Sequence, residues 1–324
     1  EPKSRGLGDV YKRQDRIYAR LTADRARAEA QAASDRAKAG LRRSPLDGVP
    51  ISWKDLYDTA GVATESGSAF LKGRVPERDA LVLERATMAG LVCLGKTHQT
   101  ELAFSGLGLN PVTASPPNVN DHEAASGGSS SGAAASVAFG LAAAGIGSDT
   151  GGSVRIPSVW NDLVGLKTVW GRLPLTGVVP LCPKFDTVGP LCRSVEDAGL
   201  LLAAMEAGKA ADLTGASLSG VRLGVLTTSA FDGIEEGPLK AFEDAVARLE
   251  AAGAVTERFD VPEVAEAMAL APIVFPAEAY GTWKDQIDAT PDLMYPPVRD
   301  RFLQGRQIGA GDYVAAWQRL DVLR

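Results

Sequence analysis

Histidine is almost absent from this sequence, which has only His98 and His122 among its 324 residues. A histidine-dependent hydrolase, or a metal site built on several histidines, therefore has very little to draw on. We expect any hydrolytic chemistry in this chain to use another base, and we assign no role to either histidine.

Cysteine, excess positive charge and long apolar runs are lacking too. The three cysteines, Cys93, Cys182 and Cys192, include no Cys-x-x-Cys pair, which indicates a reduced, cytoplasmic chain without disulfides or structural zinc. Acidic residues outnumber basic ones by 40 to 34, which argues against nucleic acid or an anionic membrane as a partner. No apolar run reaches the roughly 20 residues that a membrane span needs. The charged N-terminus also lacks the apolar stretch of a signal peptide.

The two ends of the sequence have unusual features. Residues 4–14 read SRGLGDVYKRQ, which resembles the in-frame translation of a transposase adaptor used in sequencing libraries. We expect residues 1–14 to be non-native, with a natural basic tail as the alternative. At the other end, Asp312–Arg324 has helical apolar spacing but no Gly, Asn or Pro stop signal. We therefore expect one domain over residues 15–324 that is incomplete at its C-terminus.

Helical and strand patterns alternate along the chain, which predicts an α/β fold. Expected helices are Asp15–Ala39, Asp79–Ala89, Ala133–Ala144 and Pro238–Ala252, and expected strands are Gly48–Lys54, Leu91–Leu94, Val221–Leu226 and Ala254–Phe259. Asp79 is the expected N-cap of its helix and Gly90 follows the end, while Ser194 begins a capping box. The small, polar segment Ala210–Gly220 is a loop and at most a weak domain boundary.

The segment Ser126–Ser153 has an unusual composition of 8 Gly, 7 Ser and 7 Ala among 28 residues, and Asp149 is its only charged residue. Composition alone favours a flexible linker. Val137 and Phe139 among the alanines instead favour a tightly packed helix, with a Gly-Gly-Ser group on each side. Small residues at both ends of that helix would let the backbone approach a ligand closely.

Two familiar motifs match this sequence but do not fit their chemistry. Gly90–Thr97 fits the P-loop expression, yet its four variable positions are themselves the apolar strand and cannot wrap a phosphate. Gly128–Gly132 fits the nucleophile elbow around Ser130, but that fold orders its triad as Ser, acid and His. Both histidines precede Ser130, so we exclude the α/β-hydrolase interpretation.

Three other residues form a more specific pattern. Lys54 ends a predicted strand, Ser129 lies in Gly-Gly-Ser-Ser-Ser-Gly, and Ser153 ends Gly-Ser-Asp-Thr-Gly-Gly-Ser, with spacings of 75 and 24 residues. These motifs, with the flanking GKTHQTELAFSGLGLNP at 95–111 and DTVGPLCRSVEDAGLLL at 186–202, resemble the amidase signature family of serine amidases. The resemblance runs from about Pro45 through Leu202 and, more weakly, to the C-terminus. It implies a mixed β-sheet covered by α-helices on both sides.

The resemblance also implies a catalytic role for each of the three residues. Ser153 would be the nucleophile that forms an acyl-enzyme, Ser129 would bridge it to Lys54 through a cis peptide, and Lys54 would be the terminal base. A serine hydroxyl is a poor nucleophile until a base takes its proton. Lys54 can be that base only when neutral, so burial or nearby positive charge must lower its pKa. The Gly, Ser and Ala around it contribute no carboxylate to keep it charged, and Asp55 should point to the opposite face of the strand.

The loop Thr150-Gly151-Gly152-Ser153 would supply backbone N–H groups to the oxyanion, because glycines let a substrate carbonyl come close. Asp149 and Arg155 flank this loop, and their spacing predicts an ion pair that supports it.

The resulting hypothesis is an amidase that hydrolyses a carboxylic amide to an acid and ammonia or an amine. The resemblance implies no metal and no cofactor, and the expected partner is a small-molecule amide. A homodimer stays open. One alternative is the A subunit of a glutamyl-tRNA amidotransferase, and another is an inactive fragment that acts only as a binding module. Residues 170–177, WGRLPLTG, replace a Tyr-Gly-x-Val-Ser-Arg-Tyr-Gly stretch typical of those A subunits. We therefore favour a free-standing amidase of general specificity with an apolar approach to the site.

Overall fold

The computed structural model describes residues 16–324, so the predicted non-native segment 1–14 lies outside the described residues. The chain forms two compact units. Unit 1 runs through Ala211 and includes Glu278–Gln304, and unit 2 comprises Asp212–Ala277 and Gly305–Arg324. The boundary at 211 and 212 falls in the loop that the sequence marked as a weak boundary, where we had expected a single domain.

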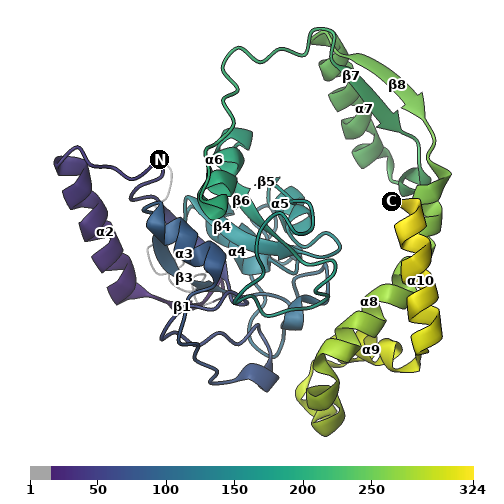
Figure 1. Ribbon diagram of the computed structural model, residues 1–324, viewed down its shortest axis with the longest axis horizontal. Coiled ribbons are helices and arrows are strands. Elements are labelled where there is room, and N and C mark those ends of the chain that lie inside the picture. Colours follow the sequence, from purple (N-terminus) through teal and green to yellow (C-terminus); the bar gives the residue numbers. More distant parts are fainter. Residues whose placement is uncertain (1–15) are drawn as a thin grey trace. The chain divides into compact units, whose positions relative to one another are not determined.

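Unit 1 is built on a six-stranded mixed sheet with the order β1-β3-β2-β4-β6-β5 (Figure 1). The strands are β1 (Tyr18–Leu21), β2 (Pro50–Lys54), β3 (Val92–Thr97), β4 (Ala144–Asp149), β5 (Val164–Gly165) and β6 (Thr187–Cys192). β2 pairs in parallel with both β3 and β4, whereas β1, β5 and β6 join by antiparallel pairing. The helices of this unit are α2 (Ala23–Lys38), α3 (Leu81–Met88), α4 (Ser131–Ala138), α5 (Arg155–Trp160), α6 (Val195–Glu206) and α9 (Pro296–Gln304).

Helix α4 packs against the centre of the sheet, and small residues make this close approach possible. Ala133 and Ala134 of α4 form a buried cluster with Val154 and Leu191. A side chain at Gly147 of β4 would place its Cβ 2.6 Å from the Ser130 hydroxyl oxygen, so only glycine fits there. Strand β4 is hard to predict from the sequence, because it consists mostly of small residues and has few of the branched residues typical of strands. The sequence thus predicted one helix over Ala133–Ala144, which was wrong in its second half.

Other element boundaries also differ from the sequence predictions. The segment predicted as one helix from Asp15 begins instead with β1, which pairs with β3. Asp79 does not cap α3, because its carboxylate binds the guanidinium of Arg25 at 2.8 Å. The N-cap of α3 is Ala80, and Gly90 follows its end at φ +97°, as expected. Ser194 does cap α6, since its hydroxyl accepts a hydrogen bond from the N–H of Asp197.

Unit 2 contains the parallel pair β7 (Arg222–Leu226) and β8 (Val255–Phe259), connected through α7 (Glu236–Ala251) (Figure 1). These three elements match the sequence predictions closely. Helix α8 (Pro262–Ala289) passes from unit 2 into unit 1, and α10 (Ala310–Leu323) belongs to unit 2. Within residues 16–324, none of the helices is long and apolar enough to cross a membrane.

Candidate active site

Lys54 is the last residue of β2, which lies in the middle of the six-stranded sheet. Its side chain is completely buried. The ammonium nitrogen Nζ lies 2.7 Å from Oγ of Ser129 and 2.8 Å from Oγ of Ser148. The carboxyl ends of parallel strands are a common place for sites in α/β sheets, and Lys54 stands at such an end between β3 and β4.

Ser129 lies in the loop that leads into α4, and it is also fully buried. The peptide bond between Gly128 and Ser129 is cis, as the family resemblance implied. The carbonyl of Ser129 accepts a hydrogen bond from the N–H of Thr100, which fixes the loop against the segment after β3. The loop thus holds the Ser129 hydroxyl against Lys54.

Ser153 lies in the short connection between β4 and α5. Its carbonyl accepts a hydrogen bond of 3.2 Å from the N–H of Ser130, so the two serine-rich loops are directly joined. Ser153 keeps 7% of its surface exposed, whereas Lys54 and Ser129 keep none. Within residues 16–324 the Ser153 hydroxyl makes no hydrogen bond, which leaves it available to a substrate.

Asp149 organises the loop before Ser153. Its buried carboxylate accepts hydrogen bonds from the N–H groups of Gly152 at 2.7 Å and Val154 at 3.1 Å, and it pairs with Arg155 at 3.0 Å. The side chains of Asp149 and Arg155 therefore meet as their spacing suggested. Gly152 has φ +131°, a conformation that other residues rarely adopt.

The occupied N–H of Gly152 changes the expected oxyanion hole. We had expected Thr150, Gly151, Gly152 and Ser153 to present donors, but the Gly152 N–H points to Asp149. In the described part of the chain, the N–H groups of Thr150, Gly151 and Ser153 have no such partner. These three are the donors that the loop leaves for a substrate oxygen.

Burial lowers the pKa of Lys54 to about 7, because a charged amine is poorly solvated in the interior. The negative charges of Asp186 and Asp149 oppose this shift. The sequence did not connect these two carboxylates with Lys54, but burial outweighs both of them, so they do not keep Lys54 charged. Asp55 is engaged elsewhere, by Arg20 at 3.0 Å and by Lys96 at 3.2 Å.

Two residues near the site were not singled out from the sequence. Ser148 contacts Lys54 directly, and Asp186 accepts a hydrogen bond of 2.5 Å from the hydroxyl of Thr150. Both lie inside motifs that the sequence displays, Gly-Ser-Asp-Thr-Gly-Gly-Ser and Asp-Thr-Val-Gly-Pro. An acidic residue three positions before Gly-Pro was the available signal for Asp186.

The rejected P-loop match is a strand in the structure. Gly95 and Lys96 lie inside β3, and Lys96 is buried with its Nζ bound to Asp55 and Thr64. The rejected elbow serine, Ser130, exchanges hydrogen bonds with the backbone of Ser148. Neither motif therefore forms the site that its sequence expression describes.

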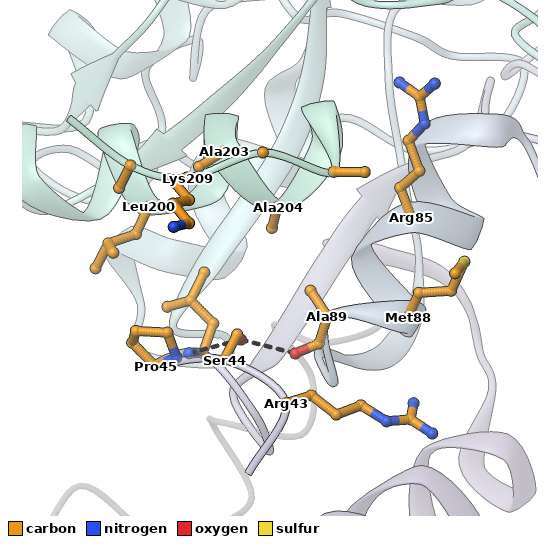
Figure 2. Close-up of a pocket in the computed structure, with 14 residues that line it drawn as sticks. Arg43, Ser44, Pro45, Arg85, Met88, Ala89, Leu200, Ala203, Ala204 and Lys209 are labelled. Atoms are coloured by element: carbon orange, nitrogen blue, oxygen red, sulfur yellow. Dashed lines mark hydrogen bonds between the residues drawn. The ribbon is translucent and has the colours of Figure 1, made fainter.

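A cavity of about 500 Å³ in unit 1 lies between α3, α6 and the loop around Ser44 (Figure 2). Two of its lining cations serve helix ends: Arg43 donates to the carbonyl of Thr87 and Arg85 to that of Met205. Such bonds satisfy carbonyls that a helix leaves unpaired at its C-terminus. The cavity contains none of the predicted catalytic residues.

The chain is similar to known amidases in sequence and structure. The amidase family profile matches residues 9–318. A solved structure described as an amidase superposes with a TM-score of 0.87 at 31% identity, covering 98% of this chain and 73% of that one. The native peptide amidase of Stenotrophomonas maltophilia superposes with a TM-score of 0.80 at 28% identity, covering 94% and 71%.

Curated relatives carry two different activities. The A subunit of the glutamyl-tRNA(Gln) amidotransferase of Anaeromyxobacter dehalogenans is 38% identical over 272 residues, which cover 80% of this chain and 55% of that protein. The 2-amino-5-chloromuconic acid deaminase of Comamonas testosteroni is 37% identical over 302 residues, covering 90% and 64%. The chain thus spans between half and two thirds of the length of these relatives. With the profile matching nearly all of its residues, the chain belongs to the amidase signature family.

Proposed function

We propose that this protein hydrolyses a carboxylic amide through an acyl-enzyme on Ser153, with Ser129 and Lys54 as the proton relay. The observation that carries the proposal is the buried contact of 2.7 Å between Lys54 and Ser129. A lysine with a pKa near 7 is neutral in a large fraction of molecules at neutral pH, so it can accept a proton.

The proposed steps start from the contact between Lys54 and Ser129. They also require the hydroxyls of Ser129 and Ser153 to form a hydrogen bond when substrate binds, because in the described residues the Ser153 hydroxyl has no such bond.

Neutral Lys54 takes the proton of Ser129, which takes that of Ser153, while Ser153 Oγ bonds to the amide carbon. N–H groups of the loop that have no acceptor in the described residues, those of Thr150, Gly151 and Ser153, are the donors for the negative oxygen that results. The relay then returns its proton to the nitrogen, the C–N bond breaks and the amine or ammonia leaves. A water molecule then attacks the acyl carbon and gives a proton to the relay. The bond between that carbon and Ser153 Oγ breaks, the relay returns the proton to Oγ, and the acid leaves.

Labelling with a serine-directed fluorophosphonate probe tests the nucleophile. We expect the wild-type protein to be labelled and Ser153→Ala to be spared. Ser217→Ala, which alters an exposed serine of unit 2, is the matched control and should label like wild type. Equal labelling of Ser153→Ala and wild type would exclude Ser153 as the nucleophile.

A second candidate function is that of an amidotransferase A subunit, which the 38% identity to such subunits favours. The segment 170–177 is the sequence feature that argues against it. In the structure Leu173 of this segment is buried, and Pro174 and Leu175 are half-buried. Ammonia release measured from L-glutamine, with and without partner subunits and tRNA, separates the two functions.

A further inference from the structure

Asp186 joins the loop that begins at Thr150 to the segment around Cys182. It lies just before β6, and β4 separates β6 from β2, the strand that carries Lys54. Its carboxylate accepts hydrogen bonds from the N–H groups of Leu181 and Cys182 at 2.9 and 3.1 Å. The loop Thr150-Gly151-Gly152-Ser153 is called the nucleophile loop here, because it ends at the proposed nucleophile. The hydroxyl of Thr150 donates to the carboxylate of Asp186 at 2.5 Å. Asp186 is 6% exposed, so water competes little for these bonds.

Asp186 and Asp149 differ in whether a positively charged side chain pairs with the carboxylate. Asp149 is neutralised by Arg155 at 3.0 Å. In the described part of the chain, Asp186 binds only neutral donors and joins no ion pair. An uncompensated buried carboxylate is costly unless another positive charge benefits from it.

We propose that Asp186 is a positioning residue of this site, which holds the nucleophile loop through Thr150 and stabilises the proton that Lys54 carries during the reaction. This inference rests on the proposed function. Lys54 must become a buried ammonium each time the relay takes the proton of Ser153. A fixed negative charge nearby lowers the free energy of that state without reorganisation.

The other charged groups around Lys54 are each paired with an opposite charge. On β2 and its continuation, Asp55 is held by Arg20 and Lys96, and the hydroxyl of Tyr57 donates to the carbonyl of Gly147. On β3, Lys96 is bound to Asp55, and on β4 and α5 Asp149 and Arg155 bind one another. The loop before α4 presents only serines and glycines. Asp186 raises the pKa of Lys54 against the effect of burial, and Asp149 does so to a smaller extent.

The test measures the rate at which the fluorophosphonate probe labels Ser153, as a function of pH. In Asp186→Asn the rise of this rate with pH should have its midpoint lower by about half a pH unit or more, because the opposing charge is gone. Asp186→Glu, which keeps the charge, should retain the wild-type midpoint. Thr150→Val, which removes only the hydrogen bond, should lower the plateau rate several-fold and leave the midpoint unchanged.

An unchanged midpoint in Asp186→Asn would overturn the inference and reduce Asp186 to a structural residue. If that variant does not fold, Asp186→Ser takes its place. Serine also lacks the negative charge, its hydroxyl can still accept a hydrogen bond, and the midpoint of its labelling rate gives the same test. A wild-type protein that is not labelled at Ser153 at any pH would instead refute the proposed function. The two failures are therefore distinct.

Discussion

The amine nitrogen of Lys54 lies 2.7 Å from the hydroxyl oxygen of Ser129, and neither side chain is exposed to solvent. This pair is the centre of the proposed relay. Its geometry, its charge and its surroundings determine what substitutions and changes of pH should do to the protein.

Replacing Lys54 by Arg should lower kcat by a factor on the order of 100 to 10,000, because arginine keeps its proton and cannot act as a base. Lys54→Ala should be impaired to a similar degree. Lys38→Arg, at an exposed lysine of α2, is the matched control and should keep wild-type activity. Steady-state hydrolysis of a simple amide checks this, and appreciable activity in Lys54→Arg would contradict the relay.

Acylation should rise with pH around a midpoint near 7, the pKa of Lys54. In the proposed relay the working form of Lys54 is the neutral amine, so the rate should be low below this value and level above it. Stopped-flow measurements or probe labelling from about pH 5 to about pH 9 give the profile on both sides of this midpoint. A rate that falls as pH rises through 7 would require a protonated group as the catalyst.

Lys54→Met should gain stability relative to wild type at neutral pH. The folded pKa of Lys54 is lowered from 10.5 to about 7, so the unfolded chain binds more protons between these values. The free energy of unfolding of the wild type should therefore increase with pH in this window, and the advantage of Lys54→Met should shrink. Thermal midpoints of both proteins at several pH values test this. An advantage that grows with pH would contradict the assigned shift.

Asp149→Ala should destabilise the protein more than Arg155→Ala. Asp149 is buried and accepts hydrogen bonds from the backbone N–H groups of Gly152, Val154 and Arg155. Its loss leaves these three groups without that partner, at a cost of about 2–4 kcal/mol. The Arg155 side chain is 51% exposed, and solvent screening reduces its contribution to about 1 kcal/mol or less. Urea unfolding of both variants compares them, and the reverse order would show that the ion pair dominates.

Simple aliphatic or aryl amides should be better substrates than L-glutamine. An apolar approach to the site discriminates weakly, at about 1–3 kcal/mol per methylene, so several amides should be accepted. Ammonia release from a panel of amides gives the ratio of kcat/KM values. A large preference for glutamine that depends on added partner subunits would favour the amidotransferase function.

The three central residues were predictable because motif and spacing placed them, although they are far apart in the sequence. Lys54 and Ser129 could be paired through the family resemblance, and the structure puts them in contact. Register was not predictable in the same way. The antiparallel pairing of β4 and β6 sets Asp149 opposite Thr187, and this alone brings Asp186 beside Thr150.

The direction of single backbone groups was equally hidden. Gly152 is conspicuous in the sequence as a donor, yet its N–H is taken by Asp149. The side chain of Asp149, three residues before Gly152, folds back onto the loop and so determines which N–H groups remain for a substrate. Similarly, β1 was predicted as helix because its short sequence has no strand alternation, and only its partner β3 makes it a strand.

The contacts of Lys54 join it to residues 75 and 94 positions further along the chain. Long closures of this kind lose much chain entropy and are slow to form, whereas helices such as α2 form from neighbouring residues. During synthesis Lys54 therefore leaves the ribosome well before its two partners, Ser129 and Ser148, have been made. The proposed relay requires the parallel pairing of β2 and β4. Labelling of Ser153 by the fluorophosphonate probe during refolding would therefore report when that pairing has formed.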